Sequence, residues 1–192
     1  MYSIFRFTCN IIVHLVFKIQ VEGAEKFPKD GPVIVYSNHK NNWDPFIIAC
    51  HVKRPVHFMA KAELFKNPVL AFFLRQINAF PVNRGTADRK AIKKALQVLE
   101  ENKVLGIFPE GTRNDSGHLL DPEPGIALLT VKSNDTTLVP LAIKGNYKPF
   151  SRIDLIFGEP NRPTIGEEKY NSQKLKELSI EIFSEVHRLM FL

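Results

Sequence analysis

The stretch VIVYSNHKNNWDPF, residues 33 to 46, indicates the architecture expected for the whole chain. Its apolar run from Val33 to Tyr36 predicts a strand buried on both faces, as in a parallel sheet covered by helices. A polar turn follows, and Pro45 then favours the first turn of a helix with Asp44 as its N-cap. Because Gly, Asn or Ser alone would make such a turn, His39 and the carboxylate indicate a chemical role.

Strand and helix patterns alternate along the rest of the chain. Short apolar runs predict strands at residues 18–25, 56–60, 79–83, 103–108, 137–143 and 152–157. Helical spacing predicts helices at residues 45–51, 62–75, 87–101, 125–133 and 174–189, the second one broken at Pro68. This alternation predicts an α/β fold: a single domain with a mostly parallel central sheet flanked by helices.

Polar residues follow three of the predicted strands, at residues 37–44, 83–85 and 109–114. The carboxyl ends of parallel strands meet at one edge of a sheet, and ligands bind there in open α/β folds. We therefore expect these three segments to converge on one site.

The composition excludes some classes of protein. The chain has 192 residues, 44% of them hydrophobic and 24% charged, which is typical of a globular domain rather than a disordered chain. The net charge of +6 favours anionic partners. The two cysteines form no CxxC pair, so we expect reduced thiols in a cytosolic compartment.

The first twenty residues predict a separate element. Arg6, Asn10, His14 and Lys18 recur every four positions in an otherwise apolar segment, so on a helix they form one polar stripe. The apolar run is too interrupted for a membrane-spanning helix and has no small-residue cleavage site. Two interpretations remain: an amphipathic helix lying in the membrane interface, or a helix packed on the protein's own core.

His39 and Asp44 can meet only if residues 40–43 form a turn, because in a continuous helix residues five apart point about 140° away from each other. If they meet, the carboxylate fixes the imidazole tautomer and the other ring nitrogen is free to take a proton from a substrate hydroxyl. The alternative is structural: Asp44 only caps the helix and His39 only ends the strand.

Two further segments, FPVNRG at residues 80–85 and FPEGTRN at residues 108–114, each place an arginine and a glycine after Phe-Pro. Arginine matches a phosphate with a planar fork of donors. Arg84 and Arg113 therefore predict a clamp for a phosphomonoester, and Glu110 could bond a substrate hydroxyl. The alternative is that both arginines are solvated surface residues.

NHKNNWD and FPEGTRN together resemble the NHx4D and FPEGTR signatures of the glycerophospholipid acyltransferases. The segments FMAKAELFKNP, FPVNRG, GIALLTVKS, TLVPLAIKG and IDLIFGEP are similar to that family and stand in its order. The resemblance covers nearly the whole chain. It implies an enzyme of the small bacterial type that acylates 1-acyl-sn-glycerol 3-phosphate, with residues 1–20 as a membrane-associating amphipathic helix and residues 21–192 as the acyltransferase domain.

The resemblance also implies roles for residues. His39 would deprotonate the 2-hydroxyl of lysophosphatidic acid, with Asp44 orienting it. The residues implied to bind the glycerol phosphate, or in the last case to shape the acyl site, are Lys61, Arg84, Glu110, Gly111, Thr112, Arg113 and Pro140.

The implied partners are lysophosphatidic acid, a donor that is acyl-CoA or acyl carrier protein (acyl-ACP), and the cytoplasmic face of the cell membrane, with peripheral or monotopic attachment. No metal, other cofactor or nucleic acid is implied. One departure concerns the donor: LLDPEPGIALL has Glu123 and Pro124 where the family often has a basic Phe-Lys stretch, so a thioester-headgroup contact is not expected there.

Other functions stay open at this point. The acceptor could be glycerol 3-phosphate, another lysophospholipid or an amino-lipid. A non-enzymatic basic module that binds nucleic acid or membrane is a second class, although the basic residues are dispersed. Metal-dependent hydrolysis by His39, Asp44 and Glu110 is a third.

Overall fold

The computed structural model describes residues 2–83, 88–114, 116, 118–133, 135–166 and 170–192. Within these residues one seven-stranded sheet has the order β1-β7-β6-β2-β5-β3-β4. Its strands are β1 (Lys18–Glu22), β2 (Val33–Ser37), β3 (Val56–Lys61), β4 (Phe80–Val82), β5 (Val104–Ile107), β6 (Thr137–Gly145) and β7 (Arg152–Phe157). Every neighbouring pair is parallel except β6 and β7. The predicted α/β class with a mostly parallel sheet is confirmed.

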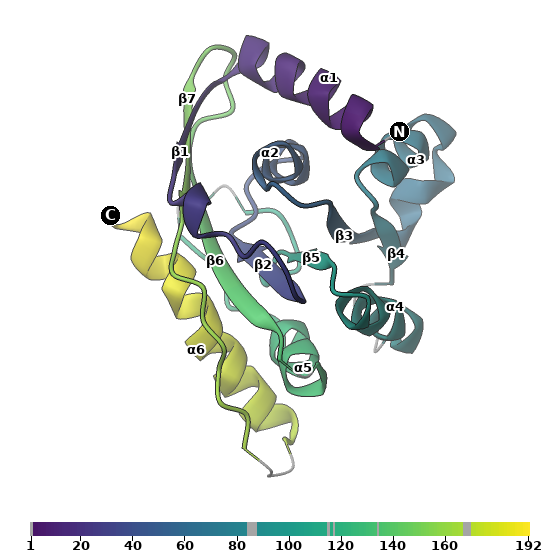
Figure 1. Ribbon diagram of the computed structural model, residues 1–192, viewed down its shortest axis with the longest axis vertical. Coiled ribbons are helices and arrows are strands. Elements are labelled where there is room, and N and C mark those ends of the chain that lie inside the picture. Colours follow the sequence, from purple (N-terminus) through teal and green to yellow (C-terminus); the bar gives the residue numbers. More distant parts are fainter. Residues whose placement is uncertain (1, 84–87, 115, 117, 134, 167–169) are drawn as a thin grey trace.

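Helices cover both faces of the sheet (Figure 1). Their bounds are α1 (Tyr2–Val16), α2 (Asp44–His51), α3 (Pro68–Gln76), α4 (Arg89–Glu100), α5 (Gly125–Lys132) and α6 (Ser172–Met190), with short 3-10 turns η1 (Ala24–Lys26) and η2 (Ala62–Lys66). Buried residues of α1, α2 and α3 pack on one face, and those of α4, α5 and α6 pack on the other. The sheet is therefore the middle layer of three.

The central strand β2 supplies both hydrophobic cores. All five of its residues are buried. Val33 and Val35 face the α1–α2 side, whereas Ile34 and Tyr36 face the α4–α6 side. Because side chains alternate along a strand, Ser37 and His39 continue the first set and lie on the α2 side.

The segment after β3 divides where Pro68 predicts a break. Residues 62–66 form the 3-10 turn η2, and α3 begins at Pro68. The Asn67 side chain caps α3 by accepting hydrogen bonds from the backbone N–H groups of Val69 and Leu70. A proline at the first helical position lacks only an N–H that would have no helical partner.

The predicted N-cap role of Asp44 is wrong. Asp44 is the first residue of α2, Trp43 stands in the cap position, and no side chain caps the helix. The Asp44 carboxylate instead accepts hydrogen bonds from the turn that precedes it, from Lys40 N and Asn41 N, at 2.7 Å each. These two backbone donors and the His39 ring all bond Oδ2, so that oxygen is not available to cap the helix.

The N-terminal helix α1 packs across α2 (Figure 1). Cys9 and Val13 are buried, while Phe7 and Leu15 are both 68% exposed. Of the predicted polar stripe, Arg6 bonds the Lys53 carbonyl. Among the described residues, no helix is both long enough and apolar enough to cross a membrane.

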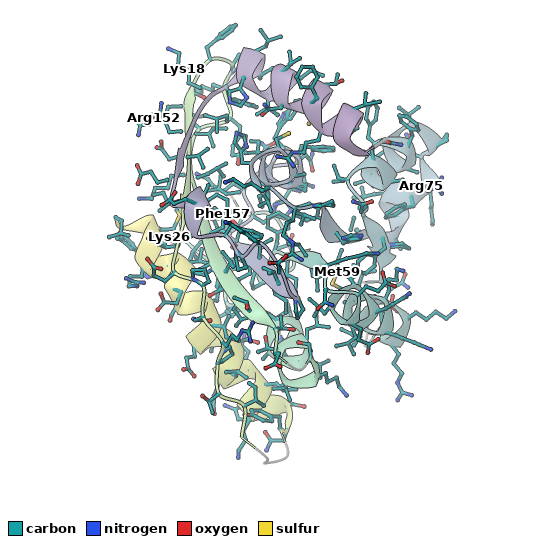
Figure 2. The ribbon with its side chains drawn as sticks, in the orientation of Figure 1. Lys18, Lys26, Met59, Arg75, Arg152 and Phe157 are labelled. Atoms are coloured by element: carbon teal, nitrogen blue, oxygen red, sulfur yellow. The ribbon has the colours of Figure 1, made fainter. Side chains whose placement is uncertain are left out.

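Two cationic residues lie at one end of the outer edge of the sheet. Lys18 of β1 lies opposite Arg152 of β7, and both project from the upper end of the sheet in Figure 2. β1 continues directly from α1, because Phe17 closes the last helical turn with a hydrogen bond to the Val13 carbonyl.

Candidate active site

The structure brings His39 and Asp44 together. His39 follows β2, and the turn of residues 40–43 returns the chain so that Nδ1 of His39 donates to Oδ2 of Asp44 at 2.8 Å. Asp44 is fully buried and His39 is 9% exposed. Among the described residues nothing bonds Nε2 of His39, so the pair has the arrangement of an oriented general base.

Aromatic rings hold the histidine from one side. The Phe108 ring lies parallel to the His39 ring with centroids 4.0 Å apart, and Phe58 stacks on Phe108 at 6.1 Å. Phe58 has room because Gly106 has no side chain: a Cβ there would lie 2.4 Å from Cε1 of Phe58. The three-ring stack of Phe58, Phe108 and His39 therefore depends on a glycine in the neighbouring strand β5.

The loop after β5 binds the histidine backbone on both sides. His39 N donates to Oε1 of Glu110 at 2.9 Å, and Asn114 N donates to the His39 carbonyl at 2.7 Å. Oε2 of Glu110 accepts from Asn114 Nδ2 at 3.2 Å and from Leu120 N at 3.0 Å. Glu110 is 5% exposed. Both of its oxygens thus have internal partners, which makes this carboxylate a tether between the two loops.

Sequence reasoning missed the role of Asn38. This buried amide donates through Nδ2 to the Ile143 carbonyl at 2.9 Å and accepts through Oδ1 from Ile143 N at 2.8 Å. The side chain thereby extends the β2–β6 ladder past Ser37, the last residue of β2. The histidine leaves the sheet from a fixed point as a result.

Of the predicted phosphate ligands, Thr112 and Arg113 are exposed in the loop after β5. Gly111 has φ 67°, a left-handed conformation that favours glycine. Lys61 ends β3, which pairs with β5, and its ammonium lies 3.4 Å from Glu63. Lys61 and the 108–114 loop therefore follow neighbouring parallel strands. Arg84 lies outside the described residues.

Pro140 is not brought together with His39 and Asp44. It lies within β6 opposite Tyr36, so its side chain is on the α4–α6 face of the sheet and His39 is on the other. Its ring faces Gly158, where an added Cβ would lie 2.7 Å from Cγ of Pro140.

A second residue that the sequence did not indicate is Tyr147. Its phenol donates a hydrogen bond to Oδ1 of Asp44 across 103 positions of sequence. Burial, and then the negative charge of Asp44, raise the pKa of Tyr147 well above its usual range. No local pattern marks this tyrosine, since it follows β6 in an ordinary polar loop.

Metal ligands do not cluster in the described part of the chain: it contains no group of three or more His, Cys, Asp or Glu side chains that could hold a metal ion. Glu110 is committed to backbone and amide donors, as described above.

Comparison with known proteins identifies the family. The profile of the Acyltransferase family matches residues 18–144, which include both loops that form the site. The chain belongs to the Acyltransferase family. The resemblance seen in the two sequence signatures is thereby confirmed, and the protein is an acyltransferase enzyme.

Curated relatives of this acyltransferase cover most of its length. The 1-acyl-sn-glycerol-3-phosphate acyltransferase of Bacillus subtilis is 30% identical over 167 residues, which are 83% of this chain and 82% of the relative. A protein of the same name from Streptococcus pneumoniae is 30% identical over 193 aligned residues, 94% of this chain and 70% of the relative.

The acyltransferase fold also matches a solved structure. The crystal structure of the 1-acyl-sn-glycerophosphate acyltransferase PlsC from Thermotoga maritima superposes with a TM-score of 0.73 at 24% identity, over 98% of this chain and 79% of that one. At this identity the match establishes the shared fold.

Proposed function

We propose that the enzyme transfers an acyl group from acyl-CoA or acyl-ACP to the 2-hydroxyl of 1-acyl-sn-glycerol 3-phosphate, giving phosphatidic acid for phospholipid synthesis. The names of the Bacillus subtilis and Streptococcus pneumoniae relatives support this acceptor. The observation that carries the chemistry is the buried hydrogen bond between His39 and Asp44, which leaves one imidazole nitrogen free.

The reaction follows from that geometry. Nε2 of His39 takes the proton of the acceptor hydroxyl while the hydroxyl oxygen attacks the thioester carbonyl carbon. The resulting imidazolium is stabilised by Asp44, to which its Nδ1–H stays bonded. The carbon–sulfur bond then breaks, the thiolate leaves and the imidazolium returns the proton to it. No covalent acyl-enzyme is needed.

His39→Ala tests the base directly. We expect acyl transfer to fall by about 10²-fold or more, the usual share of general-base catalysis, with the protein still folded. His187→Ala is the control, because His187 lies in the last turn of α6 and outside the site. Product formation from lysophosphatidic acid and a mixed pool of acyl thioesters is followed by mass spectrometry. Full activity of His39→Ala would exclude this mechanism.

The acceptor phosphate is proposed to bind Arg113, Lys61 and Arg84, with backbone groups of Gly111 and Thr112. Arg113 supports this role because it is exposed and no described residue bonds it. Arg113→Ala is expected to raise the KM for lysophosphatidic acid about tenfold at nearly constant kcat, since a charge-assisted bond contributes about 1.5 kcal/mol or more. Lys132→Ala, at the far end of α5, is the control.

A panel of acceptors separates the alternatives within the family. Glycerol 3-phosphate, other lysophospholipids and an amino-lipid are assayed with one acyl thioester under the same conditions. The proposal requires the highest kcat/KM for 1-acyl-sn-glycerol 3-phosphate. A higher value for glycerol 3-phosphate would reassign the acceptor and leave the histidine chemistry unchanged.

The exposed apolar side chains of α1 and α3 support attachment to a membrane. They are Ile4, Phe7, Ile11, Ile12 and Leu15 on α1 and Val69, Leu70, Phe72 and Phe73 on α3. Phe5 and Phe73 have ring centroids 6.5 Å apart, so the two helices form one surface, and Arg75 projects from α3 beside it (Figure 2). A contiguous apolar surface with cationic neighbours suits an anionic bilayer.

Vesicle binding tests this attachment, which we propose to occur at the cytoplasmic face of the cell membrane. Phe7→Asp and Phe72→Asp are expected to reduce sedimentation with anionic phospholipid vesicles at least about tenfold, because charged groups are costly in the interface. Phe191→Asp is the matched control: Phe191 is 78% exposed but lies at the end of α6. Equal loss in all three variants would exclude a docking role for this surface.

A further inference from the structure

The two oxygens of the Asp44 carboxylate have different partners. Oδ2 accepts from His39 Nδ1, Lys40 N and Asn41 N. Oδ1 accepts from the phenol of Tyr147, the only donor to this oxygen in the described part of the chain. The carboxylate is fully buried, so bulk water does not reach that oxygen.

Aromatic packing fixes the position of Tyr147. Its ring meets the edge of Phe17 at 5.8 Å, and Phe17 makes the same kind of contact with Trp43 at 5.7 Å. The Tyr147 loop is also anchored to the end of α1, since Phe150 N donates to the Val16 carbonyl at 2.6 Å. Packing against Phe17 and the anchored loop therefore hold the phenol at Asp44.

We propose that Tyr147 is a positioning residue for acyl transfer, which holds the Asp44 carboxylate with Oδ2 directed at His39. The inference rests on the proposed function, in which His39 is the base. With a donor on each oxygen, the carboxylate cannot rotate about its Cβ–Cγ bond without breaking hydrogen bonds at both ends. The phenol also draws negative charge toward Oδ1 and away from the oxygen that faces the imidazole.

The hydrogen bonds of this carboxylate and of its partners involve four ionisable side chains of the described residues. They are His39 and Tyr147, which bond Asp44, Glu110, which bonds the His39 backbone, and Lys40, whose ammonium bonds the Gly145 carbonyl. Because burial keeps the phenol protonated, Tyr147 donates throughout the pH range of an assay.

Tyr147→Phe removes the donor and keeps the ring against Phe17. We expect kcat to fall about tenfold, a part of the total that general-base catalysis contributes, with both KM values unchanged. The acid limb of the pH profile of kcat/KM should move to higher pH, because an Asp44 carboxylate without the phenol attracts the imidazole proton more strongly.

Tyr36→Phe is the matched control. Tyr36 is also a buried tyrosine, but it lies on the other face of the sheet and its hydroxyl bonds no described residue. We expect this variant to keep the kcat and the pH profile of the parent enzyme. His39→Ala is measured in the same series.

Two results would overturn the inference. One is a Tyr147→Phe enzyme with unchanged kcat and acid limb. The other is a loss of activity that only follows the loss of folded protein, with the acid limb in place, which indicates a packing role. An active His39→Ala would instead refute the proposed function, whereas an inactive His39→Ala beside a normal Tyr147→Phe refutes the tyrosine role alone.

Discussion

Glu110→Gln should separate a tether from a substrate ligand. The resemblance to the family implies that Glu110 binds the glycerol phosphate, and an enzyme that loses a ligand shows chiefly a raised KM for the acceptor. In the structure its carboxylate accepts three internal hydrogen bonds, from His39 N, Leu120 N and Asn114 Nδ2. We therefore expect lower stability and lower kcat, with no selective change in the acceptor KM.

The magnitude follows from those bonds. Glutamine replaces one acceptor oxygen with an NH2 donor. This NH2 group faces either the His39 N–H or the two donors to Oε2, which are Leu120 N and Asn114 Nδ2. Loss of one charge-assisted hydrogen bond costs about 1.5–3 kcal/mol. Because the His39 N–H is buried, we expect the free energy of unfolding to fall by about 2 kcal/mol. For a domain of this length that lowers Tm by about 4–8 °C.

The assay combines thermal unfolding with steady-state kinetics for lysophosphatidic acid. Glu123→Gln is the control, because Glu123 is exposed in the same loop, and its Tm should stay within about 1–2 °C of the parent. We also expect the kcat of Glu110→Gln to fall, since the tether fixes the His39 backbone. An unchanged Tm together with a raised acceptor KM would refute the tether and restore the ligand role.

Three further predictions concern the framework of the site. Gly106→Ala places a Cβ against the Phe58 ring, and relief of that overlap should cost about 1–3 kcal/mol of unfolding free energy and lower kcat, as measured by urea unfolding and turnover. Asn38→Ala leaves the buried N–H and C=O of Ile143 without their partner and should cost about 3 kcal/mol in the same unfolding assay, whereas a neutral result would mean that water or a neighbour replaces the amide. Burial lowers the pKa of His51, so below about pH 6.5 the unfolded state binds more protons than the folded state. The free energy of unfolding should therefore fall as the pH falls from 7 to 5, and in His51→Gln it should depend less steeply on pH.

The sequence predicted those parts of the site that depend only on residues close together along the chain. An apolar run, two turn-forming asparagines and a proline are enough to place His39 and Asp44 on either side of one turn, and the structure has that turn. The helix break at Pro68 is local in the same sense. The N-cap expectation failed because it considered only the helix that follows Asp44 and not the turn that precedes it.

The remaining parts depend on strand register, which short patterns do not contain. Tyr147 and Ile143 reach the site across more than a hundred positions, and their contacts require β6 to lie beside β2. The side of the sheet on which Pro140 lies follows from the same pairing. The three internal hydrogen bonds of Glu110 form only because the loop after β5 lies against His39, and no local sequence pattern specifies that contact.

The three-ring stack bears on the moment of reaction rather than on the resting enzyme. In the proposed reaction the His39 ring gains a positive charge while the acceptor oxygen attacks, and the face of Phe108, with its ring centroid 4.0 Å away, presents its negative quadrupole to that charge. This attraction strengthens as the charge develops, so it favours the transition state over the ground state. Two groups thereby stabilise the transient cation: the Phe108 ring, which has no polar atom, at the face of the imidazole, and the Asp44 carboxylate at its edge.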